Sequence, residues 1–363
     1  MRMAAKVIRT YSLAFVAGLL TLSAAIAEDV WYPVAVDVWS PPFNAEHQHT
    51  VQQYVPPGRA SRPWRICASI PHLKDDYWLA VNFGLVDEAK RLGLVLNLYE
   101  AGGYENLGTQ QSQIAECMAR NNAQALIVGA ISVDGLNSVI ADYSDKGLPV
   151  IDLINGINSD KITARVAADF YDMGLAAGKY LTALQRDTSK AAKVAWFPGP
   201  AGAGWVEAGD RGFRAALDGS SLSILEGGFG DTGLAAQTRL IEAVLDGHPD
   251  IDFIAGTAVS AEAAVQVLQK RNLEHQIKVI AYYFGPGIYR GIKRDTILAA
   301  PSDSQAVLAR IAIDQAVRAL EKQKFVRHLA VTIKMVDLKS LPEFDLNSSI
   351  APVGFRPIFS VAP

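Results

Sequence analysis

Short apolar segments alternate with longer amphipathic segments along most of this chain. From residue 63 onward the pattern predicts strands at 64–70, 94–102, 123–131 and 148–154, and the segments between them have apolar positions at helical spacing. These predicted helices are 77–93, 107–121 and 135–147. Buried strands that alternate with helices predict βαβ units built around a parallel sheet.

A second run of the same pattern follows residue 163. It predicts strands at 164–169, 192–199, 222–230, 251–257, 277–285 and 297–303, with helices between them, a long helix after residue 303 and a closing strand at 328–337. The tail 339–363 has no helical period. The pattern therefore predicts an α/β protein with two doubly wound parallel-sheet lobes. Ligands of such sheets bind beyond the carboxyl ends of the strands, so the loops after the strands are the candidate site.

The first 62 residues do not follow this pattern. Residues 1–27 have the three parts of a secretory signal peptide: basic residues near the start, an apolar stretch, and Ala-Ile-Ala at 25–27, which predicts cleavage after Ala27. An uncleaved anchor helix is the alternative, although the stretch is short for a membrane span. No later segment approaches the roughly 18 apolar residues that a span requires. Residues 28–62 are rich in Pro, Trp and His without a clear period, and we expect an extended N-terminal arm.

Composition narrows the function classes. The 363 residues carry a net charge of −3, with Lys and Arg scattered, which argues against nucleic-acid binding. A signal peptide implies an oxidising compartment, where Cys67 and Cys117 can form a disulfide. Two separate buried thiols are the alternative. Because Cys67 falls on the first predicted strand and Cys117 on the helix that crosses over it, we favour the disulfide.

Motifs for catalysis, metal binding and nucleotide binding are missing. The chain has no G-x-S-x-G elbow and no Walker A loop. Only His47 and His49 lie close together, and two ligands do not complete a zinc site. The glycine-rich segment 198–205 lacks the G-x-G-x-x-G order, so its glycines more simply let backbone line a cleft. We therefore expect a binding protein rather than an enzyme, with no cofactor and no metal.

Aromatic residues recur in the loops at the carboxyl ends of the predicted strands. They could cap the sheets as core, but their recurrence at the same end of both sheets favours a binding site. Aromatic faces around a small cavity suit a methylated ammonium group through cation–π attraction, and phenol hydroxyls suit an anionic oxygen on the same ligand. The residues of this set are Tyr77, Trp78, Tyr104, Phe170, Tyr171, Trp205, Tyr282 and Tyr283.

Two acidic residues precede the first predicted helix. Asp76 stands directly before Tyr77 and is the expected N-cap of that helix. Asp75 is then the acid expected to contact ligand or to orient a tyrosine. A sugar would require more Asp, Asn, Gln and Arg at the strand ends, where only Asn155 and Thr257 have that character.

The layout resembles the type I periplasmic binding proteins, the superfamily that includes ribose-binding and LacI-like proteins. The stretches that carry the resemblance include "LKDDYW", "FYDMG", "HPDIDFIAGTAVSAEAA" and "GFRPIF", and together they span nearly the whole chain after the signal peptide. Within that superfamily the chain is similar to periplasmic proteins that bind trimethylamine N-oxide and act with a membrane sensor histidine kinase rather than in transport.

The resemblance implies a cage for trimethylamine N-oxide between the lobes. Carried over by position, its residues are Tyr77, Trp78, Tyr104, Phe170 and Tyr283, with Asp75 nearby. The pattern of these relatives has Trp where this chain has Phe170, and Phe offers a weaker cation–π face. The solute-binding component of an ABC importer for a sugar or a methylated amine is the second hypothesis, and an enzyme on a similar scaffold is the third.

The resemblance also implies signalling by hinge closure between two lobes. We expect the first lobe to comprise 63–156 and 302–324, and the second 157–301 and 325–338. Crossovers near 156–164, 300–303 and 324–328 would form a multi-strand hinge. A ligand that contacts both lobes stabilises the closed arrangement by its differential affinity for it.

Overall fold

The computed structural model describes residues 31–43, 49–186 and 190–363. The predicted signal peptide and its cleavage site lie outside the described residues, as does His47. In the described part of the chain, no helix has both the length and the apolar character needed to cross a membrane.

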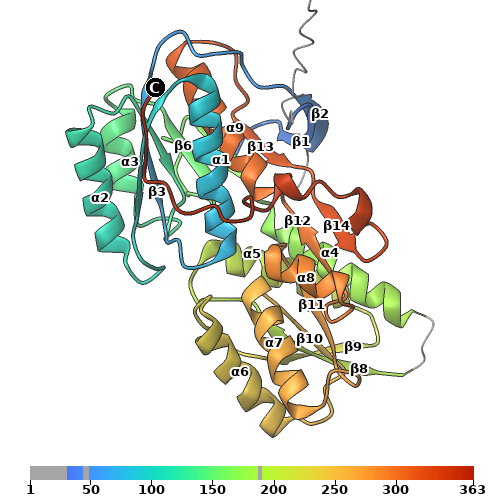
Figure 1. Cartoon of the computed structure of the whole chain (residues 1–363). Coiled ribbons are helices and arrows are strands. Elements are labelled where there is room, and N and C mark those ends of the chain that lie inside the picture. Colours follow the sequence, from blue (N-terminus) through green and yellow to red (C-terminus); the bar gives the residue numbers. More distant parts are fainter. Residues whose placement is uncertain (1–30, 44–48, 187–189) are drawn as a thin grey trace, which may run out of the picture. The chain divides into compact units, whose positions relative to one another are not determined.

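The described chain forms two large β-sheets flanked by helices (Figure 1). The first sheet has nine strands in the order β15-β4-β3-β5-β6-β7-β13-β1-β2, and the run from β4 to β13 is parallel. Its strands are β1 (Val34–Trp39), β2 (His49–Tyr54), β3 (Arg65–Ile70), β4 (Val95–Glu100), β5 (Ala125–Val128), β6 (Val150–Ile154), β7 (Ala164–Ala167), β13 (His328–Val331) and β15 (Ser360–Val361). This is the parallel α/β architecture that the alternating pattern predicts.

Helices cover both faces of the first sheet, with α1 and α9 on one face and α2 and α3 on the other (Figure 1). These helices are α1 (Asp76–Leu92), α2 (Leu107–Arg120), α3 (Asn137–Ser144) and α9 (Gln305–Leu320). Helices α1 and α9 approach so closely that a Cβ on Gly84 would lie 2.2 Å from the carbonyl oxygen of Ala306. Only glycine fits at such a crossing, and the crossing fixes the start of α1 relative to the start of α9.

The second sheet has four parallel strands in the order β11-β10-β8-β9. Its strands are β8 (Ala192–Phe197), β9 (Leu222–Glu226), β10 (Phe253–Gly256) and β11 (Lys278–Ala281), and its helices are α4 (Phe170–Gln185), α5 (Gly204–Leu217), α6 (Leu234–Gly247), α7 (Ala258–Arg271) and α8 (Pro286–Lys293). A separate antiparallel pair, β12 (Ala299–Ser302) and β14 (Lys334–Asp337), links the two sheets. We call the two sheets with their helices the first and second lobes.

Two strands that we expected in the second lobe belong to the first sheet. Strand β7 pairs with β6 in parallel, and β13 pairs with β7. The expected closing strand 328–337 is two strands, of which only β14 leaves the first sheet. The chain therefore passes between the sheets at 168–169, 303–304 and 332–333, and of the expected crossovers only the one near 300–303 is close to these. An apolar run specifies a buried strand, but it does not specify which sheet receives that strand.

The N-terminal arm and the C-terminal tail both join the first lobe. Strands β1 and β2 form an antiparallel hairpin that extends the sheet beyond β13, so the part of the expected extended arm that these two strands cover belongs to the first sheet. The tail contains two short 3₁₀ turns, η1 (Leu341–Glu343) and η2 (Leu346–Ser348), and its last strand, β15, pairs with β4. Strands β2 and β15 stand at the two edges of the sheet, and the sequence pattern revealed neither of them nor β1.

Cys67 on β3 and Cys117 on α2 are joined by a disulfide bond. Both side chains are fully buried, and they lie between the sheet and the helix that covers it. The bond closes a segment of 50 residues that includes α1 and β4. It therefore ties together the first βαβα unit, which supplies four of the predicted site residues: Asp75, Tyr77, Trp78 and Tyr104.

Removing this disulfide is expected to destabilise the protein. Closing a loop of 50 residues restricts the unfolded chain, so the double variant Cys67→Ala/Cys117→Ala should lose about 2–4 kcal/mol of unfolding free energy. Urea unfolding of the variant and of the oxidised wild type measures the difference. Wild-type protein reduced with a thiol should unfold at nearly the same urea concentration as the variant, and an unchanged midpoint in both would contradict the expectation.

Candidate ligand cavity

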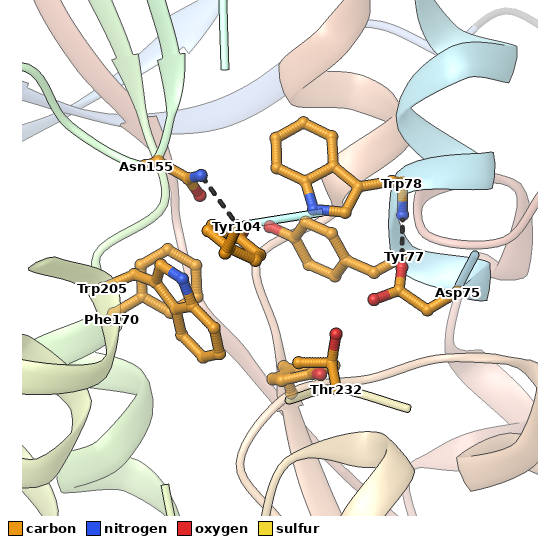
Figure 2. A pocket seen from close by; sticks show the side chains of 9 residues that line it. Asp75, Tyr77, Trp78, Tyr104, Asn155, Phe170, Trp205 and Thr232 are labelled. Carbon is orange, nitrogen blue, oxygen red and sulfur yellow. Dashed lines mark hydrogen bonds between the residues drawn. The ribbon is translucent and has the colours of Figure 1, made fainter. Parts of the chain in front are cut away.

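Nine side chains from loops and helix starts of both lobes line one cavity (Figure 2). The free volume between them is about 20 Å³, little more than one water molecule requires. The cavity as it stands therefore suits only a ligand of few atoms. The lining residues are Asp75, Tyr77, Trp78, Tyr104, Asn155, Phe170, Trp205, Thr232 and Tyr283. They include all six residues that the sequence nominated.

The first turn of α1 presents Tyr77 and Trp78 to the cavity. Asp75, not Asp76, is the N-cap of this helix: its Oδ1 accepts a hydrogen bond of 3.1 Å from the backbone N–H of Trp78. The sequence expectation placed the cap one residue too late, because two adjacent acids satisfy the capping preference equally well. Asp75 also lines the cavity, so one side chain both starts the helix and faces the site (Figure 2).

The edge of the Trp78 ring packs against Gly129 at the end of β5. A Cβ on Gly129 would meet the indole at 2.6 Å, so the ring occupies the space that any other residue would fill. The Trp78 side chain is only 2% exposed. This packing fixes the indole as a rigid wall of the cavity rather than a mobile surface group.

The second lobe contributes Phe170, Trp205 and Tyr283. Phe170 is the first residue of α4, Trp205 is near the start of α5, and Tyr283 follows β11. The rings of Phe170 and Trp205 lie 5.5 Å apart between centroids. Trp205 therefore supplies an indole to the cavity beside Phe170.

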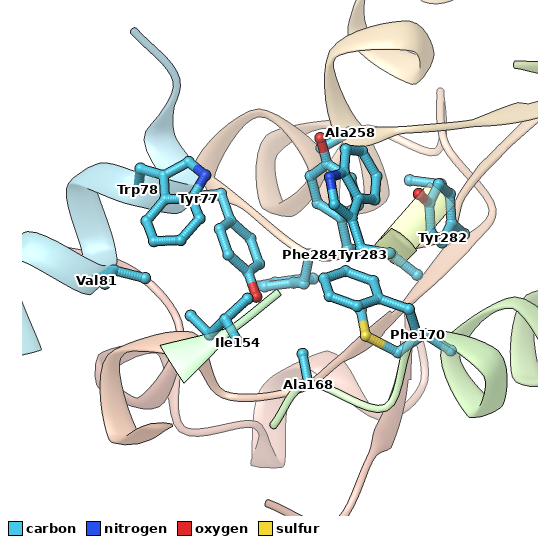
Figure 3. Close-up of a cluster of buried hydrophobic side chains, with 14 of the residues drawn as sticks. Tyr77, Trp78, Val81, Ile154, Ala168, Phe170, Ala258, Tyr282, Tyr283 and Phe284 are labelled. Carbon is cyan, nitrogen blue, oxygen red and sulfur yellow. The ribbon is translucent and has the colours of Figure 1, made fainter. Parts of the chain in front are cut away.

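Aromatic rings from the two lobes meet across the cavity. Tyr77 and Tyr283 contact edge to face at 5.5 Å between centroids, and Tyr104 lies 6.0 Å from Trp205. Figure 3 shows Tyr77 and Trp78 approaching Tyr283 and Phe170 within one buried apolar cluster. A ligand held here contacts both lobes, which is the condition for coupling binding to the lobe arrangement.

Apart from the three tyrosines, the one ionisable residue among the nine that line the cavity is Asp75. Burial raises the pKa of Asp75 to about 6, and it raises the pKa of Asp303, which bonds to Tyr77 behind the wall, to about 6 as well. None of the nine lining residues is Lys, Arg or His. His72 packs beneath Trp78 and Tyr104, and burial lowers its pKa to about 4, so its ring is neutral at pH 7. The site therefore offers rings and carboxylates, which favour positive charge.

The sequence missed three lining residues as parts of this site: Asn155, Trp205 and Thr232. Trp205 stood in the aromatic set but was not carried into the expected cage, and Asn155 had been associated with sugar binding. Thr232, in the loop before α6, carried no signal of its own. Tyr282, also in the aromatic set, is fully buried, and its hydroxyl donates to the carbonyl oxygen of Pro198, which makes it a core residue.

Metal binding has no visible basis in the described residues. They contain no group of three or more His, Cys, Asp or Glu side chains placed to hold an ion. His49 instead lies 3.2 Å from a carboxylate oxygen of Asp37 on the neighbouring strand of the hairpin.

Residues 66–324 match the family described as a periplasmic binding protein domain, which covers most of the chain. The chain belongs to this family, and its fold is that of the type I periplasmic binding proteins. It is 36% identical to the periplasmic protein TorT of Escherichia coli K12 over 328 residues, which cover 88% of this chain and 93% of TorT. The resemblance inferred from the sequence is confirmed at this level.

Two solved structures extend the comparison. A solute-binding protein of an ABC transporter from Bradyrhizobium sp. BTAi1, solved with bound bis-tris, is 46% identical, with a TM-score of 0.82 over 91% of this chain and 99% of that one. TorT in complex with the TorS sensor domain, solved without ligand, is 32% identical, with a TM-score of 0.75 over 82% of this chain and 99% of that one. A second structure of the TorS–TorT complex contains trimethylamine N-oxide, abbreviated TMAO in its description.

Proposed function

We propose that this protein binds trimethylamine N-oxide, or a related small methylated amine, between its two lobes in the periplasm. In this proposal the bound protein signals to a membrane sensor histidine kinase that regulates trimethylamine N-oxide respiration. The observation that carries the proposal is the cavity itself: six aromatic rings and a buried carboxylate surround a small space that no basic side chain lines. The proposal assigns the chain no catalytic step and no cofactor.

The chemistry of the ligand matches the wall. Methyl groups on a positively polarised nitrogen are attracted to the faces of Trp, Tyr and Phe, each worth about 0.5–2 kcal/mol depending on how dry the site is. The carboxylate of Asp75, buried beside the rings, favours the same positive end. Phenol hydroxyls are available for the oxygen of an N-oxide. A sugar would leave most of this apolar wall without a partner.

Closure of the lobes is the proposed signal. The lining residues come from both lobes, and the chain passes between the lobes at three short segments, so a ligand that bridges the cavity favours one arrangement. Lys74 of the first lobe and Asp231 of the second pair at 3.2 Å near the cavity and supply a further contact sensitive to closure. The similarity to TorT in complex with a TorS sensor domain supports a kinase as the partner that reads the arrangement.

A solute-binding role in an ABC importer is the second candidate. The 46% identity to the Bradyrhizobium solute-binding protein favours it. Both candidates share the cavity and differ in the partner. Pull-downs with this protein as the bait, with and without trimethylamine N-oxide, separate them. Ligand-dependent capture of the purified sensor domain encoded nearest the gene supports signalling, and capture of a permease instead supports import.

Calorimetric titration with trimethylamine N-oxide, betaine, choline and ribose tests the ligand class. The methylated compounds should bind, with trimethylamine N-oxide the tightest because it is the smallest and carries an oxygen acceptor. Ribose should give no heat of binding. Binding of ribose without a response to the N-oxide would refute the proposal.

Affinity for trimethylamine N-oxide is expected to fall in mild acid. The pKa of Asp75 is raised to about 6 in the empty site, and a positively polarised ligand favours the carboxylate, so the proton and the ligand compete. Affinity should therefore decrease by about tenfold between about pH 7 and about pH 5. Titrations across this range measure the slope.

The matched control is Asp75→Asn, which keeps a side chain that caps helices well. The variant should bind more weakly at pH 7 and should lose most of the pH dependence. A slope that is the same in wild type and variant would assign the titration to a different group.

A further inference from the structure

The hydroxyl groups of Tyr77 and Tyr104 play opposite parts in their hydrogen bonds: the Tyr77 hydroxyl donates and the Tyr104 hydroxyl accepts. The Tyr77 hydroxyl lies 2.5 Å from Oδ2 of Asp303, and both side chains are buried. A carboxylate can only accept, so the proton of Tyr77 is directed at Asp303 and away from the cavity. A ligand oxygen therefore cannot receive this proton unless the bond to Asp303 breaks.

Tyr104 is arranged the other way round. Its hydroxyl oxygen accepts a 3.1 Å hydrogen bond from Nδ2 of Asn155 (Figure 2). The amide orientation is fixed, because the same Nδ2 donates at 2.7 Å to the carbonyl oxygen of Ala130, which can only accept. Both amide protons are thus committed, one to each partner. Among the described residues, no acceptor bonds the proton of Tyr104, and its ring lines the cavity.

The backbone around Asn155 is built to hold this amide. Ile154 directly before it has φ of 71°, a left-handed conformation that is strained for a β-branched residue. The Asn155 side chain follows this turn at the end of β6 and reaches the carbonyl oxygen of Ala130, just after β5. Gln110 braces the same end of β5: its Nε2 donates to the carbonyl oxygen of Gly129, and its Oε1 accepts from the N–H of Ile131. The carbonyl group that orients Asn155 is therefore itself held in place.

We propose that Asn155 is a positioning residue that turns the Tyr104 proton into the cavity and so makes the site select ligands that carry an oxygen acceptor. This inference rests on the proposed function and refines its ligand class: an N-oxide is preferred over a methylated ammonium ion of the same shape. Burial and the nearby charge of Asp75 disfavour ionisation of Tyr104, which keeps its hydroxyl a donor at neutral pH. Tyr77 contributes its ring to the wall and its hydroxyl to Asp303.

Two ligands of nearly equal shape test the inference. Trimethylamine N-oxide and tetramethylammonium differ in whether an oxygen or a methyl group fills the fourth position on nitrogen, and in net charge, since the N-oxide is neutral overall. The ratio of the two affinities in each variant is therefore compared with the ratio in wild type. Wild type should prefer the N-oxide, and Tyr104→Phe should weaken N-oxide binding by about tenfold or more while leaving tetramethylammonium within about threefold. Tyr77→Phe should change the affinity for both ligands by the same factor, so that the preference is retained.

Asn155→Leu tests the positioning role directly. Leucine has nearly the same size but donates nothing, so the Tyr104 hydroxyl is free to turn away, and the preference for the N-oxide should fall by about threefold to tenfold. A loss of fold is monitored by thermal melting. If Asn155→Leu does not fold, Asn155→Ser and the two tyrosine variants decide, because the ratio of the two affinities does not depend on the amount of folded protein.

The outcomes separate the inference from the function on which it rests. If wild type binds neither ligand, the proposed function is refuted and the inference with it. If wild type binds both and Tyr104→Phe weakens both by the same factor, the ligand class stands and the selective role of Tyr104 is overturned. If Tyr104→Phe removes the preference but the Asn155 variants retain it, Tyr104 is the donor and Asn155 does not position it.

Discussion

Replacing Trp78 with alanine is expected to reduce the affinity for trimethylamine N-oxide by at least about a hundredfold. The indole is a rigid wall of the cavity, packed on Gly129 and 2% exposed, and its removal takes away a cation–π face and opens the cavity to water. The same substitution should cost about 3–5 kcal/mol of stability, because a large buried ring leaves a void. Calorimetry gives the affinity and urea unfolding the stability.

Trp39→Ala is the matched control. Trp39 is also buried, at 6% exposed, but it stacks on His328 in the hairpin region and does not line the cavity. It should lose stability on a similar scale and bind normally. Unchanged affinity in Trp78→Ala, or an equal loss in both variants, would refute the aromatic cage.

Replacing Arg91 with methionine is expected to destabilise the protein by about 3–5 kcal/mol, because it leaves the buried carboxylate of Glu88 without its charged partner. Arg91 bonds to both carboxylate oxygens of Glu88 and lies 3.7 Å from Oδ1 of Asp314, and both acids are fully buried. Their other partners are in the N-terminal hairpin region: Trp31 donates to Glu88 and Tyr54 to Asp314. The cluster thus joins α1, α9 and the hairpin, and urea unfolding measures its contribution.

The deficit of Arg91→Met should shrink as the pH falls. Burial and the neighbouring Glu88 raise the pKa of Asp314 well above its usual value. A raised pKa in the folded state means that protonation relieves a cost of folding, so stability contributed by this group is present at low pH and is lost as the pH rises through the folded pKa. Arg120→Met is the control, since Arg120 and Glu116 form an exposed pair worth about 0–1 kcal/mol. Equal deficits in the two variants would contradict the buried cluster.

Much of the site could be predicted because its signals are local. Tyr77, Trp78, Tyr104, Phe170 and Tyr283 each stand within a few residues of a predicted strand end, and parallel strands bring such loops to one edge of a sheet. The match to a known family then selected five aromatic residues and Asp75 from a longer set. Tyr282 shows the limit of the local signal, because it neighbours Tyr283 in sequence but points into the core.

The role of each acid could not be predicted in the same way. Asp75 and Asp76 have the same capping preference. Which of them is the cap depends on the residue at which the loop after β3 ends and the helix begins. Asp303 gave no signal, since its contact with Tyr77 joins residues 226 positions apart in sequence. Contacts of this separation form only when α1 and α9 have packed.

The sequence by itself determined the order of strands and helices from β3 to α9, the family, and six of the residues that line the cavity, because periodicity and strand-end position are properties of neighbouring residues. Only the tertiary structure decided that β7 and β13 belong to the first sheet, that Trp205 stands beside Phe170, and that Asn155 orients Tyr104. These outcomes depend on which distant segments pair. Strand pairing and side-chain convergence are set by the packing of the whole fold, which no local pattern of apolar and polar residues encodes.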